Sequence, residues 1–170
     1  KNVDLAKIIP EIDSLKLEGN INGKLDILQK NGNYLPNSTV VIDNFKVNNH
    51  EFGSFDANII GNENLTKYTV DVTIKDDVKN SFRAKGDISV IGKQSNIDVD
   101  LELNDFNLQP INPFLHDVLT DIRGLASGKV NVVGRLKRPD INGELSLDKS
   151  GFGIPYLNVD YQFANKSSVT

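Results

Sequence analysis

The feature that most constrains the fold of this chain is a strict alternation of apolar and polar residues. In YTVDVTI, residues 68–74, every second side chain is apolar, and NIDVDLELN, residues 96–104, follows the same rule. A period of two predicts β-strands that have one buried face and one wet face. Clusters of Gly, Asn, Asp and Pro separate the alternating runs and predict turns at residues 30–37, 48–54, 61–64, 76–80, 92–96 and 148–155. We therefore expect an all-β chain of about nine strands, mainly antiparallel because the connections are short.

A helical period is clear in one segment, PINPFLHDVLTDIRG, at residues 110–124. Asn112 suits the N-cap, Pro113 suits the first helical position, and Gly124 suits the stop, so the segment predicts a short amphipathic helix over residues 113–123. Its apolar stripe could plug one end of the sheet interior, or it could act as a gate. The stripe consists of Phe114, Leu115, Val118, Leu119 and Ile122. A shorter helical turn is expected within residues 5–15.

An internal repeat links the two ends of the chain. Residues 5–47 resemble residues 108–150, with Gly19 matching Gly124 and Gly23 matching Gly128. Since the composition does not change between the copies, we expect residues 1–170 to form one continuous segment and not two domains. The chain also begins at Lys1 and contains no methionine, so we expect it to be part of a longer protein.

The apolar face of such a sheet must be covered. One helix of about ten residues cannot cover nine strands, so the sheet is expected to fold over itself as a sandwich, a barrel or a rolled trough. The inward positions carry Leu, Ile, Val, Phe and Tyr, with no Trp and no Met, and only 7% of the residues are aromatic, which predicts a smooth aliphatic lining.

Charge and composition exclude several classes of function. The net charge is −4 and no basic run is present, which argues against nucleic-acid binding and against docking on anionic headgroups. No apolar stretch reaches the roughly 20 residues of a membrane-spanning helix. The chain has no cysteine, so disulfides, thiolate chemistry and cysteine metal sites are impossible.

Several motifs look chemical but have simpler explanations. GNINGK at 19–24 and GLASGK at 124–129 resemble a P-loop, yet the spacing is too short and a strand follows each lysine, so we expect no nucleotide site. Asp98, Asp100 and Glu102 share the wet face of one strand. His50 and His116 have no partner at catalytic or ligand spacing. We predict no catalytic residue, no metal site and no cofactor, and hence a protein that is not an enzyme.

The region after the predicted helix carries a family pattern. Glycines, a lysine, a proline and alternating aliphatic residues follow in a fixed order: Gly124, Gly128, Lys129, Gly134, Leu136, Pro139, Ile141, Gly143, Leu145 and Leu147. This order resembles the TamB and AsmA-like proteins. The resemblance is densest over residues 103–163 and weaker over 5–47, where LQKNGNYLPN at 28–37 replaces the short connector.

The resemblance implies a long sheet curled into a taco-like trough, within a periplasmic region of a protein anchored in the inner membrane of a Gram-negative envelope. It implies phospholipid transport between the inner and outer membranes. An alternative is a scaffold that helps assemble outer-membrane β-barrel proteins beside a barrel insertase of the TamA type. A closed β-sandwich surface domain is a further alternative. Expected partners are phospholipids and, through the whole protein, the barrel; nucleic acid and nucleotides are not expected.

The residues expected to line a lipid-binding groove follow from the parity of each alternating run. They are Leu25, Ile27, Val70, Val72, Val99, Leu101, Val130, Val132, Leu145 and Leu147.

Overall fold

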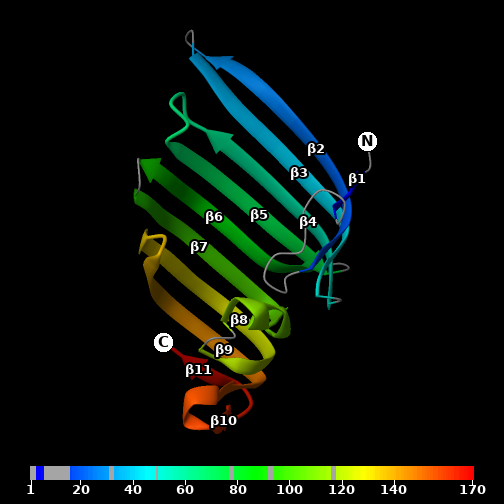
Figure 1. Cartoon of the computed structure of the whole chain (residues 1–170), viewed down its shortest axis with the longest axis vertical. Coiled ribbons are helices and arrows are strands. Elements are labelled where there is room, and N and C mark those ends of the chain that lie inside the picture. Colours follow the sequence, from blue (N-terminus) through cyan, green and yellow to red (C-terminus); the bar gives the residue numbers. More distant parts are fainter. Residues whose placement is uncertain are drawn as a thin grey trace.

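The fold is known from a computed structural model, which describes residues 3–5, 16–30, 33–48, 50–76, 79–91, 94–115 and 118–170. All strands in these residues belong to one sheet, every pairing is antiparallel, and the spatial order of β1 to β10 follows the sequence. The sheet curls without closing (Figure 1), so the predicted all-β trough is confirmed. Because the sheet is open, the described residues do not form a closed β-sandwich.

Eight long strands make up most of the described residues. They are β2 (Leu17–Lys30), β3 (Asn33–Val47), β4 (His50–Gly61), β5 (Lys67–Asp76), β6 (Lys79–Ile91), β7 (Gln94–Asn107), β8 (Thr120–Arg135) and β9 (Arg138–Ile154). Short strands flank them: β1 (Val3–Asp4) pairs with β2, whereas β10 (Val159–Gln162) and β11 (Ser167–Val169) both pair with β9. Helical turns are η2 (Gln109–Ile111), α1 (Asn112–Leu115) and η3 (Pro155–Leu157).

The helix predicted over residues 113–123 is much shorter in the structure. The helix α1 ends at Leu115, Val118 lies in a turn, and β8 has begun by Thr120. The predicted span is therefore wrong at its C-terminal end, and Ile122 is a buried strand residue. Most of residues 6–15, where the second helical turn was expected, lie outside the described residues.

The side chain of Asn112 explains why the helix stops early. Its Oδ1 accepts a hydrogen bond from the backbone N–H of Ile122 at 2.7 Å, and its Nδ2 donates to the carbonyl of Ile122 at 2.8 Å. Asn112 thus satisfies both backbone groups of Ile122 in the way a neighbouring strand would. These bonds, made between residues ten positions apart, favour an extended backbone at Ile122 over the helical period.

A line of β-bulges crosses one end of the sheet. In β3, β4, β7 and β9 a residue with positive φ lies beside a shift of register or a close backbone approach: Asn44 (φ 54°), Gly53 (φ 82°), Asp105 (φ 47°) and Lys149 (φ 50°). Bulges bend a strand and increase its twist. They also let residues three apart face the same side, as Ile42 and Phe45 do.

The bulged end of the sheet is filled by aromatic side chains. We call Phe45, Phe52, Phe55, Phe82 and Phe106 the phenylalanine plug. Their ring centroids lie 5.4–6.0 Å apart in successive contacts. Thus the aliphatic lining expected from composition is found along most of the sheet, but aromatic rings replace it at this end.

The phenylalanine plug shows how tightly the sheet is curled. The rings of Phe52 in β4 and Phe106 in β7 stack 5.5 Å apart, although β5 and β6 lie between these strands. In a flat sheet three strand spacings would separate them by about 14 Å. The sheet must therefore curl toward the face that carries these rings.

Candidate functional site

Strand register divides the sheet into an apolar face and a polar face. Directly paired residues share a face, and one row runs Val40–Ala57–Val72–Ala84–Leu101–Val130 from β3 to β8. The neighbouring row runs Ile59–Val70–Gly86–Val99–Val132–Ile141 from β4 to β9. Both rows are apolar throughout, so the alternation in the sequence has become a continuous surface.

We call the part of the apolar face away from the phenylalanine plug the aliphatic half. It comprises Ile59, Val70, Val72, Ile88, Ile97, Val99, Leu101, Val130, Val132 and Ile141. Burial falls off toward β9: Val99 is 5% exposed, Val132 is half-buried, and Ile141 is 66% exposed. In the part of the chain that the structure describes, the buried cluster here, around Val70, Ala84 and Val99, is built from side chains of β4–β7.

The structure brings most of the predicted groove residues together. Val70, Val72, Val99, Leu101, Val130 and Val132 all lie in the aliphatic half, and Val99 pairs directly with Val132. Leu145 and Leu147 lie on the same face of β9, nearer the bulged end. Leu25 and Ile27 lie in β2 opposite Ser38 and Pro36, and their side chains are outside the described residues.

Two groups of residues on this face were not among the predicted groove residues. Ile59, Ile88 and Ile141 continue the aliphatic rows, and their parity within each strand could have identified them. The phenylalanine plug was also missed. The sequence signal for the plug was two apolar residues three positions apart, with Asn, Asp or Gly between them, as in Leu103–Asn104–Asp105–Phe106.

The predicted plugging residues are scattered. Leu115 and Val118 are exposed, Leu119 is half-buried, and Ile122 is buried in β8. The side chain of Phe114 is outside the described residues. A plugging role for these residues remains a prediction.

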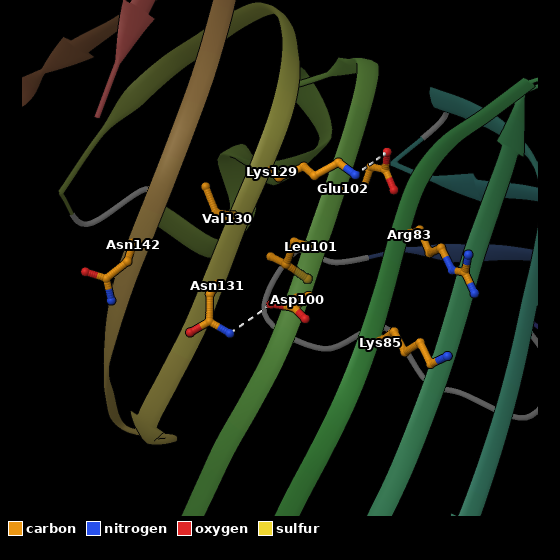
Figure 2. Close-up of a pocket in the computed structure, with 9 residues that line it drawn as sticks. All are labelled: Arg83, Lys85, Asp100, Leu101, Glu102, Lys129, Val130, Asn131 and Asn142. Atoms are coloured by element: carbon orange, nitrogen blue, oxygen red, sulfur yellow. Dashed lines mark hydrogen bonds and ion pairs between the residues drawn. The ribbon is translucent and has the colours of Figure 1, made fainter.

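The polar face carries cross-strand pairs of opposite charge (Figure 2). Lys129 lies 3.3 Å from Glu102, and Asn131 donates hydrogen bonds to Asp98 and Asp100 at 3.3 and 3.0 Å. Asp100, Glu102, Lys129 and Asn131 border a depression of about 550 Å³ that Arg83, Lys85 and Asn142 also line. Exposed pairs of this kind contribute little stability, so we interpret them as the solvated side of the sheet.

Two hydrogen-bonded pairs on this face shift pKa values. Asp71 accepts two hydrogen bonds from Arg83, at 3.3 and 3.0 Å, and they raise the pKa of the guanidinium. Bonds from Lys67 and Thr69 lower the pKa of Asp87. In both cases the shift favours the charged form at neutral pH. Neither pair presents a group ready to donate or accept a proton in catalysis.

The structure also places the motifs that looked chemical. GNINGK lies within β2 and GLASGK lies within β8, so both are strand segments. His50 is the first residue of β4, and His116 is outside the described residues. Among the described residues, no three His, Asp or Glu side chains are grouped to hold a metal ion.

Arg123 ties the short strand β10 to β8 across the intervening β9. Its Nη1 and Nη2 donate to the two carboxylate oxygens of Asp160 at 2.9 and 2.8 Å, and its Nε donates to Gln162 at 3.2 Å. The side chain passes over Gly151, where a Cβ would lie 2.6 Å from Nη2. A glycine in β9 therefore makes room for the pairing.

We expect Asp160→Asn to loosen β10. The hydrogen bond from Arg123 lowers the pKa of Asp160, so the pair stabilises the fold above the ordinary aspartate pKa, and this stabilisation is lost as the pH falls through the lowered value. Amide hydrogen exchange, corrected for intrinsic rates, should quicken in residues 159–162 of the variant at neutral pH. The wild type should approach the variant in acid. Asp140→Asn, at the far end of β9, is the control, and equal exchange in all three proteins would contradict the prediction.

Residues 1–147 match the family model described as TamB, N-terminal domain. This chain belongs to that family. No curated protein and no solved structure gave a match. The TamB match covers β1 to β8 and the first part of β9, which includes both the aliphatic half and the phenylalanine plug.

Membership of the TamB family indicates an envelope protein of the TamB type. TamB proteins are associated with the cell envelope and act as non-enzymatic assembly or transport modules. Among the described residues, no helix is long and apolar enough to span a membrane.

Proposed function

We propose that this TamB domain shields the acyl chains of phospholipids on the aliphatic half of its apolar face while they move between the inner and outer membranes. The observation that supports this most strongly is the unbroken pair of apolar rows from β4 to β8. They form one surface of Val, Ile, Leu, Ala and Gly on a sheet that curls toward it. In this proposal the domain lies in the periplasm, within a protein anchored in the inner membrane.

The energetics favour such a surface. Each methylene that leaves a bilayer for water costs about 0.8 kcal/mol, so two chains of 16 carbons cost roughly 25 kcal/mol. An aliphatic surface offsets most of this cost without polar contacts to any headgroup. The same surface could bind many phospholipids, because it recognises only the length and shape of the acyl chains.

A barrel insertase of the TamA type is the proposed partner of the whole protein at the outer membrane. The polar face fits a water-filled periplasm, since it carries alternating charges and hydrogen-bonded pairs across β5 to β8. With the polar face toward water, the apolar face on the other side of the same strands would remain available for lipid.

A charge on the apolar face should block lipid binding. We expect Val132→Lys to abolish co-purification of phospholipid with the folded protein, because a buried ammonium against acyl chains carries a large desolvation cost. Val133→Lys is the matched control. Val133 is the next residue in β8, is also half-buried, and points to the polar face between Asp98 and Asp140.

Mass spectrometry of extracted lipid and circular dichroism of each variant give the readout. The proposal predicts lipid with the wild type and with Val133→Lys, and little or none with a folded Val132→Lys. Equal lipid in all three proteins, or none in the wild type, would overturn it.

A further inference from the structure

Among the described residues, the phenylalanine plug is packed from two directions, whereas the aliphatic half is packed only by side chains of the sheet. Side chains of β3, β4, β6 and β7 form it from the sheet, and Leu108 and Ile111 pack against it from beside and within η2. Leu5, only 2% exposed, belongs to the same cluster. The bulged end of the sheet therefore has a cover of its own, and its interior is filled by protein.

The cover is fixed to the sheet by hydrogen bonds. The two bonds between Asn112 and the backbone of Ile122 hold α1 against β8, and the N–H of Leu108 donates to the carbonyl of Gly124 at 3.0 Å. Asn112 also donates to the carbonyl of Gln109 at 2.8 Å, which links α1 back to η2. The turn that caps the plug is thus bonded at both of its ends.

The aliphatic half is packed differently. Its buried cluster contains only neighbours within β4–β7, and it continues to the half-buried Val130 and Val132 and to the exposed Ile141. Val70 and Val99, at its centre, are as buried as the plug, but the half-buried and exposed side chains around them keep surface for another apolar molecule. The two ends of the same strands are therefore unequal: one is already filled, and the other can still bury apolar surface.

We propose that the phenylalanine plug is a fixed wall that confines a bound acyl chain to the aliphatic half. This inference rests on the function proposed above. The bound acyl chain lies across the strands, along the rows from β4 to β9. It meets the wall where Phe82 pairs with Leu103. It does not run down the strands toward η2. Of the predicted groove residues, the half-buried Val72, Leu101 and Val132 contact lipid, and Leu147, which is buried in β9 near the bulged end, does not.

Two positions in β7 test this directly. Ile97 and Leu103 are both half-buried, lie on the same face, and stand six residues apart, or about 20 Å along the strand. Because the chain has no cysteine, Ile97→Cys and Leu103→Cys each give one site for an environment-sensitive fluorophore. The quencher is a phosphatidylcholine that carries a nitroxide on its acyl chain, delivered to the whole 170-residue chain from vesicles.

The expected result is strong quenching at residue 97 and clearly weaker quenching at residue 103, which lies at the wall itself. Equal quenching at both sites would overturn the wall and leave the proposed lipid binding intact. No quenching at either site would overturn the proposed lipid binding, and the wall with it.

A second measurement needs no substitution and covers the case in which a labelled variant does not fold. A fatty acid that bears a photoreactive diazirine is irradiated with the unmodified chain, and the cross-linked peptides are mapped by mass spectrometry. Adducts should fall within residues 56–61, 68–72, 97–101 and 130–134. Adducts concentrated in residues 42–55 and 103–111 would contradict the wall.

Discussion

Phe106→Ala is expected to lower the free energy of unfolding by about 3–5 kcal/mol, the usual cost of removing a buried phenylalanine ring. Phe106 is 9% exposed, and its ring lies 5.5 Å from that of Phe52 and 5.6 Å from that of Phe82. It therefore joins β4, β6 and β7 at one point. Truncation leaves a cavity that the bulged strands cannot easily close. Urea denaturation followed by circular dichroism measures the loss.

Tyr156→Ala serves as the control for that measurement. Tyr156 lies in η3 and is 96% exposed, so its removal should change the free energy of unfolding by no more than about 0.5 kcal/mol. If the two variants lost equal stability, the ring of Phe106 would not be packed as described, and the phenylalanine plug would not hold the curl of the sheet.

The second large effect is expected from Gly124→Ala. Gly124 has a φ of 95°, a conformation that strains any residue with a side chain, and an added Cβ would lie 2.4 Å from the Cα of Ser150 and 2.7 Å from the carbonyl oxygen of Lys149. The backbone strain and the steric overlap together cost about 2–6 kcal/mol. Relief would require β8 and β9 to separate at the bulge. Thermal and urea unfolding should both show the loss.

Gly134→Ala separates the two costs. Gly134 lies in the same strand with a similar φ of 108°, but the nearest atom to an added Cβ is 3.7 Å away, on the side chain of Asp140. This variant should carry only the backbone strain, about 1–3 kcal/mol. Similar losses for the two variants would mean that the close approach of β8 to β9 at Ser150 does not matter.

The strands and their two faces could be predicted from the sequence because alternation is a local signal. Val99 and Val132 were assigned to one lining from parity alone, and the register pairs them directly. Parity works here because each strand has one apolar face. A slip of the strand register by one residue would turn all of these apolar side chains to the solvent. The family was also recognisable, since its glycines and prolines fall at fixed positions in the alternating runs.

The extent of the helix could not be predicted because its residues fit both the helical period of about 3.6 residues and the strand period of two. Ile122 continues a helical stripe from Val118, yet it also stands between Asp121 and Arg123 as an alternating strand residue. The two bonds from Asn112 decide for the strand, and these bonds depend on tertiary structure. The apolar period alone therefore predicts a helix whose C-terminal end lies too far along the sequence.

The phenylalanine plug depends on contacts between strands that are distant in the sequence. Phe52 and Phe106 meet only because bulges turn them to the same side and the sheet curls between them. The local pattern around each bulge was present, as in Ile42–Asp43–Asn44–Phe45, but it resembles an ordinary turn. A prediction of which rings meet would have needed the register of four strands.

The sequential order of the strands has a consequence for how the chain folds. Each long strand pairs with the strand before it, so every new hairpin needs only its predecessor as a template, and little entropy is lost in closing long loops. The stack of Phe52 on Phe106 is an exception, since it bridges two intervening strands. The first strands can therefore assemble one after another as the chain emerges, but the curl becomes locked only when β7 arrives and delivers Phe106.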